Sequence, residues 1–306
     1  MTPDYSIVIP VFNSEQSLNE LAERIQKVFS SLGKSYEIIF VDDYSSDKSW
    51  DAIKSLRQKD PGKVRCIRLA KNYGQHNATL CGFQHATGSF IITLDDDLQN
   101  PPEEIPKLIQ RIQETSADVV YGISKNQHSL ARRTGSGIWK HYSEKFEQGY
   151  GNGSSFRLIK SEIIQKIIHY RQYFVFVDQL LYWHTAAAEF VQVEHHARVH
   201  GKSRYSRKTL FSLSGNLIIF YTSLPLKLMT YSGIILSFGS MLLALYFILR
   251  KIFLHVRVEG FTALIVAILF STSMMLICFG IIGEYLARIY SVLNERPTFA
   301  IKEKQI

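Results

Sequence analysis

Two groups of aspartates follow apolar, strand-like segments directly. Asp42 and Asp43 come after residues 36–41 (YEIIFV), and residues 90–94 (FIITL) precede Asp95, Asp96 and Asp97. Ligands of an open parallel α/β sheet bind at the carboxyl ends of its strands, so we expect both groups at that edge. Asp-x-Asp supplies hard oxygen ligands that suit Mg²⁺ or Mn²⁺ bridging to phosphates. A solvated turn is the alternative, and the triplet alone does not decide between them.

The chain lacks the glycine-rich loops that cradle phosphates. No G-x-G-x-x-G follows the first apolar segment, residues 5–12, and no G-x-x-x-x-G-K occurs in the chain. Neutralising a bound phosphate would therefore fall to a metal ion and to basic side chains. This combination is typical of a metal–diphosphate site without a phosphate loop.

Strand-like and helix-like segments alternate in the first part of the chain. We expect strands at residues 5–12, 36–41, 64–69, 90–94 and 118–121, with a helix at 15–32. Near-continuous apolar strands separated by helices indicate a mostly parallel sheet covered on both faces. A further helix begins with Asn100 as its cap, followed by two prolines and by two glutamates that complement the helix dipole.

The rest of this domain is less regular. We expect a strand at residues 156–159, helices near 161–169 and 178–184, and a strand at 190–193. Residues 124–153 are polar, basic and glycine-containing, which is typical of a loop over a site.

Two long apolar segments follow. Residues 228–249 and 260–283 contain no charged residue, and each is long enough for a helix to cross about 30 Å of hydrocarbon. We expect three parts: an α/β domain at 1–205, an interfacial amphipathic helix at 206–226, and a transmembrane hairpin with a tail at 227–306.

Charge indicates which side of the membrane the domain occupies. The formal net charge is +8, and basic residues cluster before the first apolar segment and after the second. Cytosolic flanks tend to be basic, so this favours a cytosolic domain and cytosolic termini, although Arg250, Lys251 and Arg257 between the segments count against it. The N-terminus has no secretory leader pattern, and three scattered cysteines predict neither disulfides nor a zinc site. No nucleic-acid reader motif accompanies the basic charge.

Several motifs, in order, resemble family-2 glycosyltransferases with the GT-A fold. They are YSIVIPVFN, FVDDYSSDKS, KNYGQHNATLCGFQHATG and ITLDDDLQNPPEEIP, with HHARVHGKSRYS, SLPLKLMTYSG and GIIGEYLARIYSVLNERP further on. The similarity extends over nearly the whole chain and is greatest to the bacterial polyprenyl-phosphate glycosyltransferases, such as the undecaprenyl-phosphate aminoarabinose and glucosyl transferases. It implies an integral protein of the plasma (inner) membrane.

The resemblance implies roles for individual residues. Asp95 and Asp97 would bind the metal and the donor diphosphate, with Asp96 between them, and Lys71 would lie near the nucleotide. Arg157 would face the reacting phosphate. The uracil and ribose would be held by Pro10, Asn13, Glu15 and Asp42.

Two positions depart from the family pattern. Tyr44 replaces the usual glycine after the paired aspartates, and Ser155 stands where the G-D-F-R-L motif has a carboxylate that is a candidate base. A phosphate monoester with a second pKa of about 6 is already largely ionised at neutral pH, so the acceptor needs alignment more than it needs a base. Asp178 is either a substitute carboxylate or a helix N-cap, and we favour the N-cap.

A basic segment precedes the interfacial helix. We expect its cations to align the lipid phosphate together with Arg157, although they also suit a simple positive-inside anchor: Arg198, Lys202 and Arg204.

The expected reaction is an inverting, metal-dependent, single transfer of a sugar from a nucleotide-sugar, with UDP favoured, to polyprenyl phosphate, and the resemblance also suggests a homo-oligomer. Two alternatives stay open. One is a processive polysaccharide synthase, although Tyr182 replaces the arginine of its Q-x-x-R-W motif. The other is an inactive membrane scaffold or lipid-translocating protein.

Overall fold

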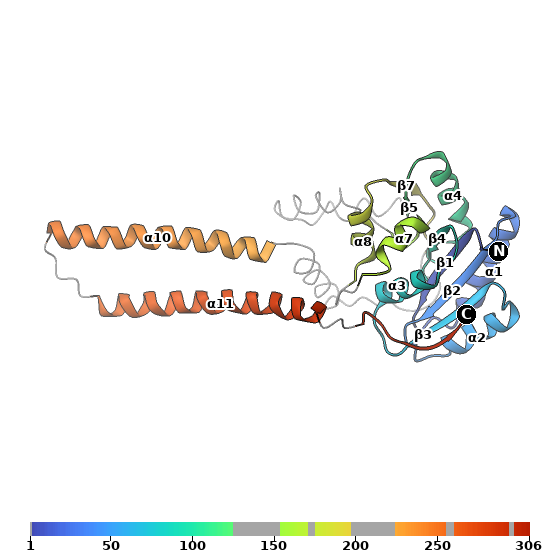
Figure 1. Ribbon diagram of the computed structural model, residues 1–306, viewed down its shortest axis with the longest axis horizontal. Coiled ribbons are helices and arrows are strands. Elements are labelled where there is room, and N and C mark those ends of the chain that lie inside the picture. The colour runs from blue at the N-terminus through green and yellow to red at the C-terminus, as the bar shows by residue number, and fades with distance from the viewer. Residues whose placement is uncertain (1, 125–153, 171–174, 197–223, 255–259, 294–296) are drawn as a thin grey trace. The chain divides into compact units, whose positions relative to one another are not determined.

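The computed structural model describes residues 2–124, 154–170, 175–196, 224–254, 260–293 and 297–306 (Figure 1). The chain divides into two compact units. One unit joins Met1–Lys202 to Pro297–Ile306, and the other is Ser203–Arg296. The last ten residues therefore belong to the same unit as the N-terminal part of the chain.

The first unit contains one eight-stranded sheet in the order β7-β5-β6-β4-β1-β2-β3-β8. Its strands are β1 Tyr5–Val11, β2 Tyr36–Asp42, β3 Val64–Leu69, β4 Phe90–Thr93, β5 Val119–Ile123, β6 Arg157–Lys160, β7 Ala188–Gln192 and β8 Ile301–Gln305. Parallel pairs join β1 to β2 and β4, β2 to β3, and β5 to β7. β6 runs antiparallel to β4 and β5, and β8 runs antiparallel to β3. The sheet is thus mixed, with its central strands parallel.

Helices cover both faces of this sheet. Two sets, each packed on one face, are α1 Leu18–Leu32, α2 Ser49–Lys59 and α4 Ile105–Glu114, and then α3 Gln75–His85, α7 Ser161–Ile167 and α8 Val177–His184. Successive side chains of a strand point to opposite faces of the sheet, so each strand contributes to both cores. Ile7 and Ile9 of β1 lie in the first core, and Val8 lies in the second. The expectation of a sheet covered on both faces is confirmed.

The start of α4 differs from the prediction. A 3-10 turn, η1 Pro102–Glu104, comes first, and the N-cap of α4 is Glu104 rather than Asn100. The cause is the proline pair, because the residue before a proline is pushed out of the helical conformation. Pro101, which precedes Pro102, is extended with φ −68° and ψ 137°, so no helix can begin at Asn100.

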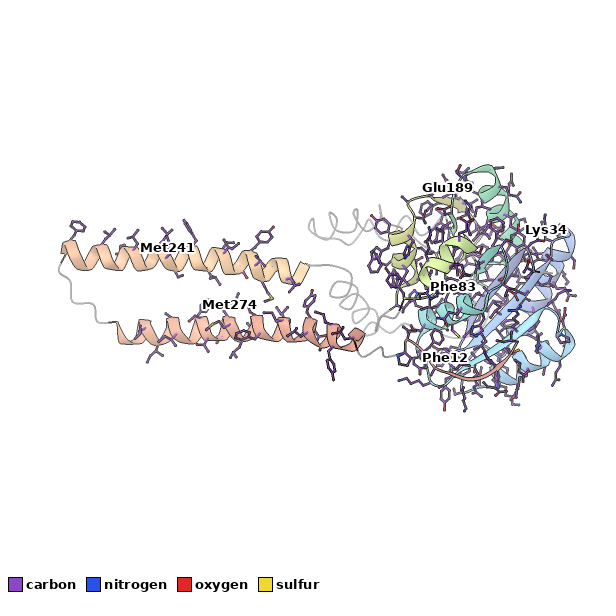
Figure 2. The ribbon with its side chains drawn as sticks, in the orientation of Figure 1. Phe12, Lys34, Phe83, Glu189, Met241 and Met274 are labelled. Carbon is purple, nitrogen blue, oxygen red and sulfur yellow. The ribbon has the colours of Figure 1, made fainter. Side chains whose placement is uncertain are left out.

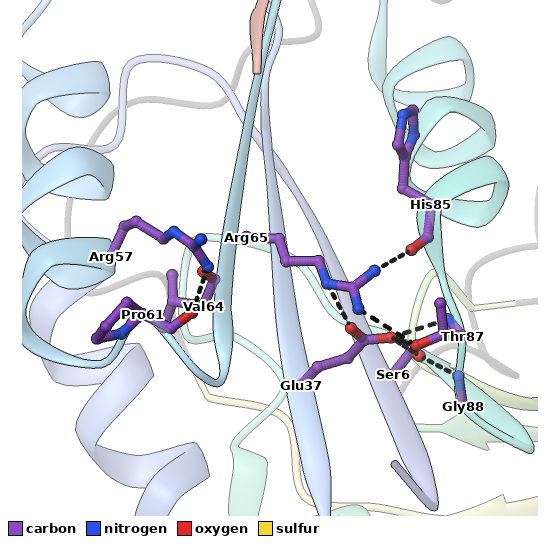
Figure 3. Close-up of polar contacts among 9 residues, drawn as sticks. All are labelled: Ser6, Glu37, Arg57, Pro61, Val64, Arg65, His85, Thr87 and Gly88. Atoms are coloured by element: carbon purple, nitrogen blue, oxygen red, sulfur yellow. Dashed lines mark hydrogen bonds and ion pairs between the residues drawn. The ribbon is translucent and has the colours of Figure 1, made fainter. Parts of the chain in front are cut away.

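A buried polar cluster fixes the amino-terminal edge of the sheet (Figure 3). Glu37, on β2, accepts hydrogen bonds from Ser6 Oγ (2.6 Å) and from the backbone and side chain of Thr87 (both 2.8 Å). Arg65 Nε, on β3, lies 2.7 Å from the other oxygen of this carboxylate. These contacts tie three neighbouring strands and the turn before β4 to one buried charge, and they lie at the opposite edge from the aspartates.

The second unit contains two long helices, α10 Leu224–Leu254 and α11 Phe261–Leu293. In the described residues, one window, Phe270–Ala287, is long and apolar enough to cross a membrane, and α10 has a shorter apolar stretch at Leu228–Leu242. The two transmembrane helices expected from sequence are therefore not both established. Apolar side chains project from both helices, as Met241 does in Figure 2, and Met241 is 66% exposed. The expected interfacial helix lies outside the described residues except for its last three, which begin α10.

Candidate active site at the carboxyl edge of the sheet

Backbone strain marks one edge of the sheet. In the described part of the chain, three residues other than glycine have a positive φ: Asn13 (53°), Tyr44 (62°) and Leu98 (61°). They follow β1, β2 and β4, whose carboxyl ends lie side by side. Such conformations cost about 1–3 kcal/mol each and concentrate at functional sites. The candidate site therefore lies at this edge, as the aspartates predicted.

Asp96 joins the loops after β1 and β4. It is buried, and its Oδ2 accepts hydrogen bonds from the Phe12 backbone N–H (3.0 Å) and from Ser14 Oγ (2.6 Å). Asn13 in turn joins the loops after β1 and β2, because its Oδ1 accepts a hydrogen bond from the Ser46 N–H at 2.8 Å. These contacts hold the three loops in one arrangement, and they occupy the Asp96 carboxylate.

The paired aspartates at the end of β2, Asp42 and Asp43, are both buried. Asp42 accepts a hydrogen bond from the Ser45 N–H at 3.1 Å and faces Arg68, whose Nε lies 3.0 Å from its Oδ2. Asp43 accepts from the N–H groups of Tyr73 (2.7 Å) and Gly74 (2.8 Å), directly before α3. Burial raises the pKa of Asp43 to about 6, against the lowering effect of those two bonds. Asp43 thus fixes the entry into α3.

Asp95 accepts hydrogen bonds from two segments that are distant in the sequence. Gln75 Nε2, in the first turn of α3, lies 2.7 Å from its Oδ1, and the Ser155 hydroxyl donates to its Oδ2. Burial raises the pKa of Asp95 to about 6; the Ser155 bond lowers it, and the nearby Asp97 and Asp96 raise it further. Ser155 is therefore a donor to the predicted metal ligand, and it directly precedes the Phe156–Arg157 pair.

Arg157 lies in the core of the site and is 2% exposed. Its Nε donates to Thr93 Oγ1 at 3.0 Å, and its Nη1 donates to Asp178. Asp178 is the second residue of α8, whose N-cap is Phe176, so the predicted capping role is wrong. Burial raises the pKa of Asp178, whereas Arg157 and a hydrogen bond with Tyr121 lower it. The carboxylate forms a buried ion pair with the arginine that sequence placed at the reacting phosphate.

His76 completes this group. Its ring packs edge-on against Phe176 with centroids 4.7 Å apart. Burial lowers the pKa of His76 to about 3, and the charge of Arg157 lowers it as well. The imidazole is therefore neutral at physiological pH. Its neutrality leaves Arg157 as the cation of this group.

A model of the family described as "Glycosyl transferase family 2" matches residues 6–168. The undecaprenyl-phosphate 4-deoxy-4-formamido-L-arabinose transferase of Edwardsiella ictaluri (strain 93-146) is 34% identical over 304 residues, covering 97% of this chain and 93% of that protein. The chain belongs to glycosyl transferase family 2.

Solved structures agree on the fold of this glycosyltransferase. Glucosyl-3-phosphoglycerate synthase from Mycobacterium tuberculosis, in complex with Mn²⁺, uridine-diphosphate and phosphoglyceric acid, has a TM-score of 0.51. It is 15% identical, with 71% of this chain and 76% of that chain covered. The same enzyme with Mg²⁺ and uridine-diphosphate has a TM-score of 0.50 and 14% identity, with 71% and 77% covered. The sheet is that of a GT-A glycosyltransferase.

The carboxylates Asp95 and Asp97 of the glycosyltransferase could together bind a divalent cation that also binds phosphate groups. Asp95 and Asp97 are both half-buried, and their mutual repulsion is one cause of the raised pKa of Asp95. Across the described residues, no group of three or more His, Cys, Asp or Glu side chains could hold a metal. Two carboxylates are, however, the usual protein share of a Mg²⁺ site that is completed by substrate phosphates and water.

The other predicted site residues occupy varied positions. Pro10 is buried within β1, and Glu15 and Lys71 are exposed, with Lys71 Nζ 5.1 Å from the ring centroid of Tyr73. The predicted acceptor cations lie outside the described residues: Arg198, Lys202 and Arg204.

Sequence reasoning did not single out Gln75 and His76, which reach the site from α3. The signal available was their place in NYGQHNATL, directly after the left-handed Gly74.

Proposed function

We propose that this glycosyltransferase moves a sugar from a nucleotide-sugar, with UDP as the nucleotide, to polyprenyl (undecaprenyl) phosphate in one inverting, metal-dependent transfer. One contact carries the proposal. Ser155 donates a hydrogen bond to the candidate metal ligand Asp95, and Ser155 stands two residues before Arg157 in the sequence. A carboxylate suited to a metal diphosphate and a cation suited to a second phosphate thus meet at one edge of the sheet. The relative in Edwardsiella ictaluri, named as an undecaprenyl-phosphate sugar transferase, supports the acceptor.

On the donor side, Asp95 and Asp97 would hold Mg²⁺ or Mn²⁺. The bound cation would supply positive charge to stabilise the departing nucleoside diphosphate. Gln75 and Ser155 orient the Asp95 carboxylate. The base and ribose would lie against the loops after β1 and β2, near Pro10, Asn13, Glu15 and Asp42, with Lys71 and Asp96 alongside. The glucosyl-3-phosphoglycerate synthase structures with uridine-diphosphate support UDP as the nucleotide only through the shared fold.

On the acceptor side, alignment replaces proton abstraction. The phosphate of a polyprenyl phosphate is largely ionised at neutral pH, since its second pKa is about 6. Arg157 would face this phosphate with Nη2, because its Nε and Nη1 already bind Thr93 and Asp178. Asp178 holds the guanidinium and is not needed as a base. The cations Arg198, Lys202 and Arg204 would add charge at the level of the lipid headgroup.

The return of the chain to the first unit supports the membrane topology. The chain up to Lys202 and strand β8 after α11 both belong to that unit. A segment that leaves a domain and returns to it crosses a membrane an even number of times. We therefore propose that both α10 and α11 span the inner membrane, with the catalytic domain (1–205) and both termini in the cytosol and the interfacial helix (206–226) between domain and membrane.

Nucleoside diphosphate release tests this function directly. Purified protein in detergent would receive undecaprenyl phosphate, Mg²⁺ or Mn²⁺, and UDP-, GDP- and dTDP-sugars in turn. We expect release that requires both the lipid and the metal, that stops with EDTA, and that yields a lipid carrying one sugar. Release without lipid would refute the acceptor, and a lipid carrying many sugars would refute the single transfer.

A further inference from the structure

The C-terminal strand reaches the same edge of the sheet as the candidate active site. β8 runs antiparallel to β3, so its first residue, Ile301, pairs with Leu69 at the end of β3. The contact extends beyond the strand, because the Ala70 N–H donates to Ala300 O at 2.8 Å. Phe299 and Ile301 also pack against the core on the α3 face. Residues that follow α11 are thus held beside the loops after β2 and β3.

Tyr44 lies in one of these loops and presents its ring to solvent. It follows the paired aspartates, has a φ of 62° and is 44% exposed. A non-glycine residue in this conformation costs about 1–2 kcal/mol, and an exposed ring regains little of that by burial. Glycine, which adopts a positive φ without strain, would stabilise the loop better. A functional role, rather than a contribution to stability, therefore explains the tyrosine at this position better.

Two cations lie near the Tyr44 ring. Arg68 Cζ is 5.7 Å from its centroid, and Lys302 Nζ, from β8, is 5.5 Å from it. Arg68 also faces Asp42 and donates to Ser45 O at 3.1 Å, so it is partly committed to the loop. Among the described residues, no carboxylate lies within ion-pair distance of Lys302. Its ammonium is therefore available to a ligand.

We infer that Tyr44, Arg68 and Lys302 form the subsite for the base of the donor nucleotide, so that the C-terminal strand is part of the donor site. A nucleobase is a flat ring edged with carbonyl oxygens. The open part of the Tyr44 ring offers it a stacking surface, and Lys302 offers an N–H donor for a carbonyl. This inference rests on the proposed nucleotide-sugar donor. It assigns recognition of the base to residues that come before the two long helices in the sequence and to one that comes after them.

The test compares Lys302→Ala and Tyr44→Gly in the full-length protein. Tyr44→Gly removes the ring and relieves the strained φ, so its effect on binding is not confused with misfolding. Lys304→Ala is the matched control, because it removes the same charge from the same strand, opposite Ile67 and away from Tyr44. Binding of UDP and of inorganic pyrophosphate would be measured by calorimetry with Mg²⁺ present, together with the donor KM and kcat.

We expect the Kd of UDP and the donor KM to rise about tenfold in Lys302→Ala and in Tyr44→Gly, with kcat and pyrophosphate affinity unchanged. Lys304→Ala should match the wild type. Unchanged UDP affinity in both variants would overturn the inference. An equal loss for pyrophosphate would also overturn it, because the residues would then bind phosphate rather than base. A wild-type protein that binds no nucleotide at all would instead refute the proposed function.

Discussion

Arg157 and Asp178 form a buried ion pair between β6 and α8, at the centre of the candidate active site. The side chains of the two residues are 3% and 11% exposed. A second pair on β6, between Lys160 and Asp118, spans 3.0 Å, but its side chains are 33% and 28% exposed. Strand β6 therefore carries one buried ion pair and one partly exposed ion pair. Variants of the two pairs can be compared to test whether the buried pair matters for activity.

Asp178→Asn should lower kcat at least tenfold and leave the donor KM nearly unchanged, because it releases the Arg157 guanidinium that we propose faces the acceptor phosphate. Breaking a buried pair also costs about 3–5 kcal/mol, so the thermal unfolding temperature in detergent should fall. Lys160→Gln is the control, and a partly exposed pair contributes only about 0–1 kcal/mol. Full activity in Asp178→Asn would show that Arg157 needs no partner for its role.

Asp97→Ala should abolish nucleoside diphosphate release without affecting membrane insertion, because it removes one of the two carboxylates that we propose hold the metal. Release assays and membrane fractionation would measure the two effects separately. Asp51→Ala, an exposed aspartate on α2 paired with Lys54 at 2.9 Å, should retain full activity. Substantial turnover in Asp97→Ala would remove this residue from the metal site.

Asp43 should make stability depend on pH in an unusual direction. Burial raises its folded-state pKa from 3.8 to about 6, so between these values the folded state holds a proton that the unfolded state has lost. The contribution of Asp43 to stability therefore falls as pH rises through this window, by about 3 kcal/mol in total.

The measurement for Asp43 is thermal unfolding of the wild type and of Asp43→Asn at several pH values from 4 to 7. Asparagine does not titrate, so the wild type should lose stability relative to the variant as pH increases. A difference that stays constant across this range would contradict the raised pKa.

Gly82→Ala should destabilise the protein because α3 lies against the sheet with no room for a side chain. A Cβ at this position would meet Val8 Cγ1 at 2.3 Å. Overpacking of this kind costs about 1–3 kcal/mol. Gly62→Ala is the control, since its nearest neighbour would be 3.8 Å away. Equal unfolding temperatures for the two variants would show that α3 shifts freely.

The sequence predicts the central strands well, because β1 and β2 are short, mostly apolar runs bounded by turn residues. It also locates the edge at which the aspartates gather. It does not predict the partner of Asp178, since an aspartate near a helix start has the same local pattern whether it caps the helix or pairs with a residue 21 positions earlier. The choice depends on where the fold brings Asp178 relative to Arg157, which no local pattern records.

Strand β8 was not predicted from the sequence either. Its residues, IKEKQ, show no apolar run, and four of the five are exposed. The strand is held by backbone pairing with β3 and by Phe299 and Ile301, which pack against the core at its start. A polar strand of this type has no signature of its own, so the tail assigned to residues after α11 contained an element that only the three-dimensional pairing reveals.

The position of β8 in the chain also constrains how the protein is made. The ribosome synthesises β3 early and β8 only after both α10 and α11, so the edge of β3 stays unpaired while the helical segment is translated. An exposed strand edge is a template for pairing with other chains. The first unit therefore finishes folding only after both long helices have been synthesised, and translation stalled within α11 would leave an aggregation-prone nascent chain.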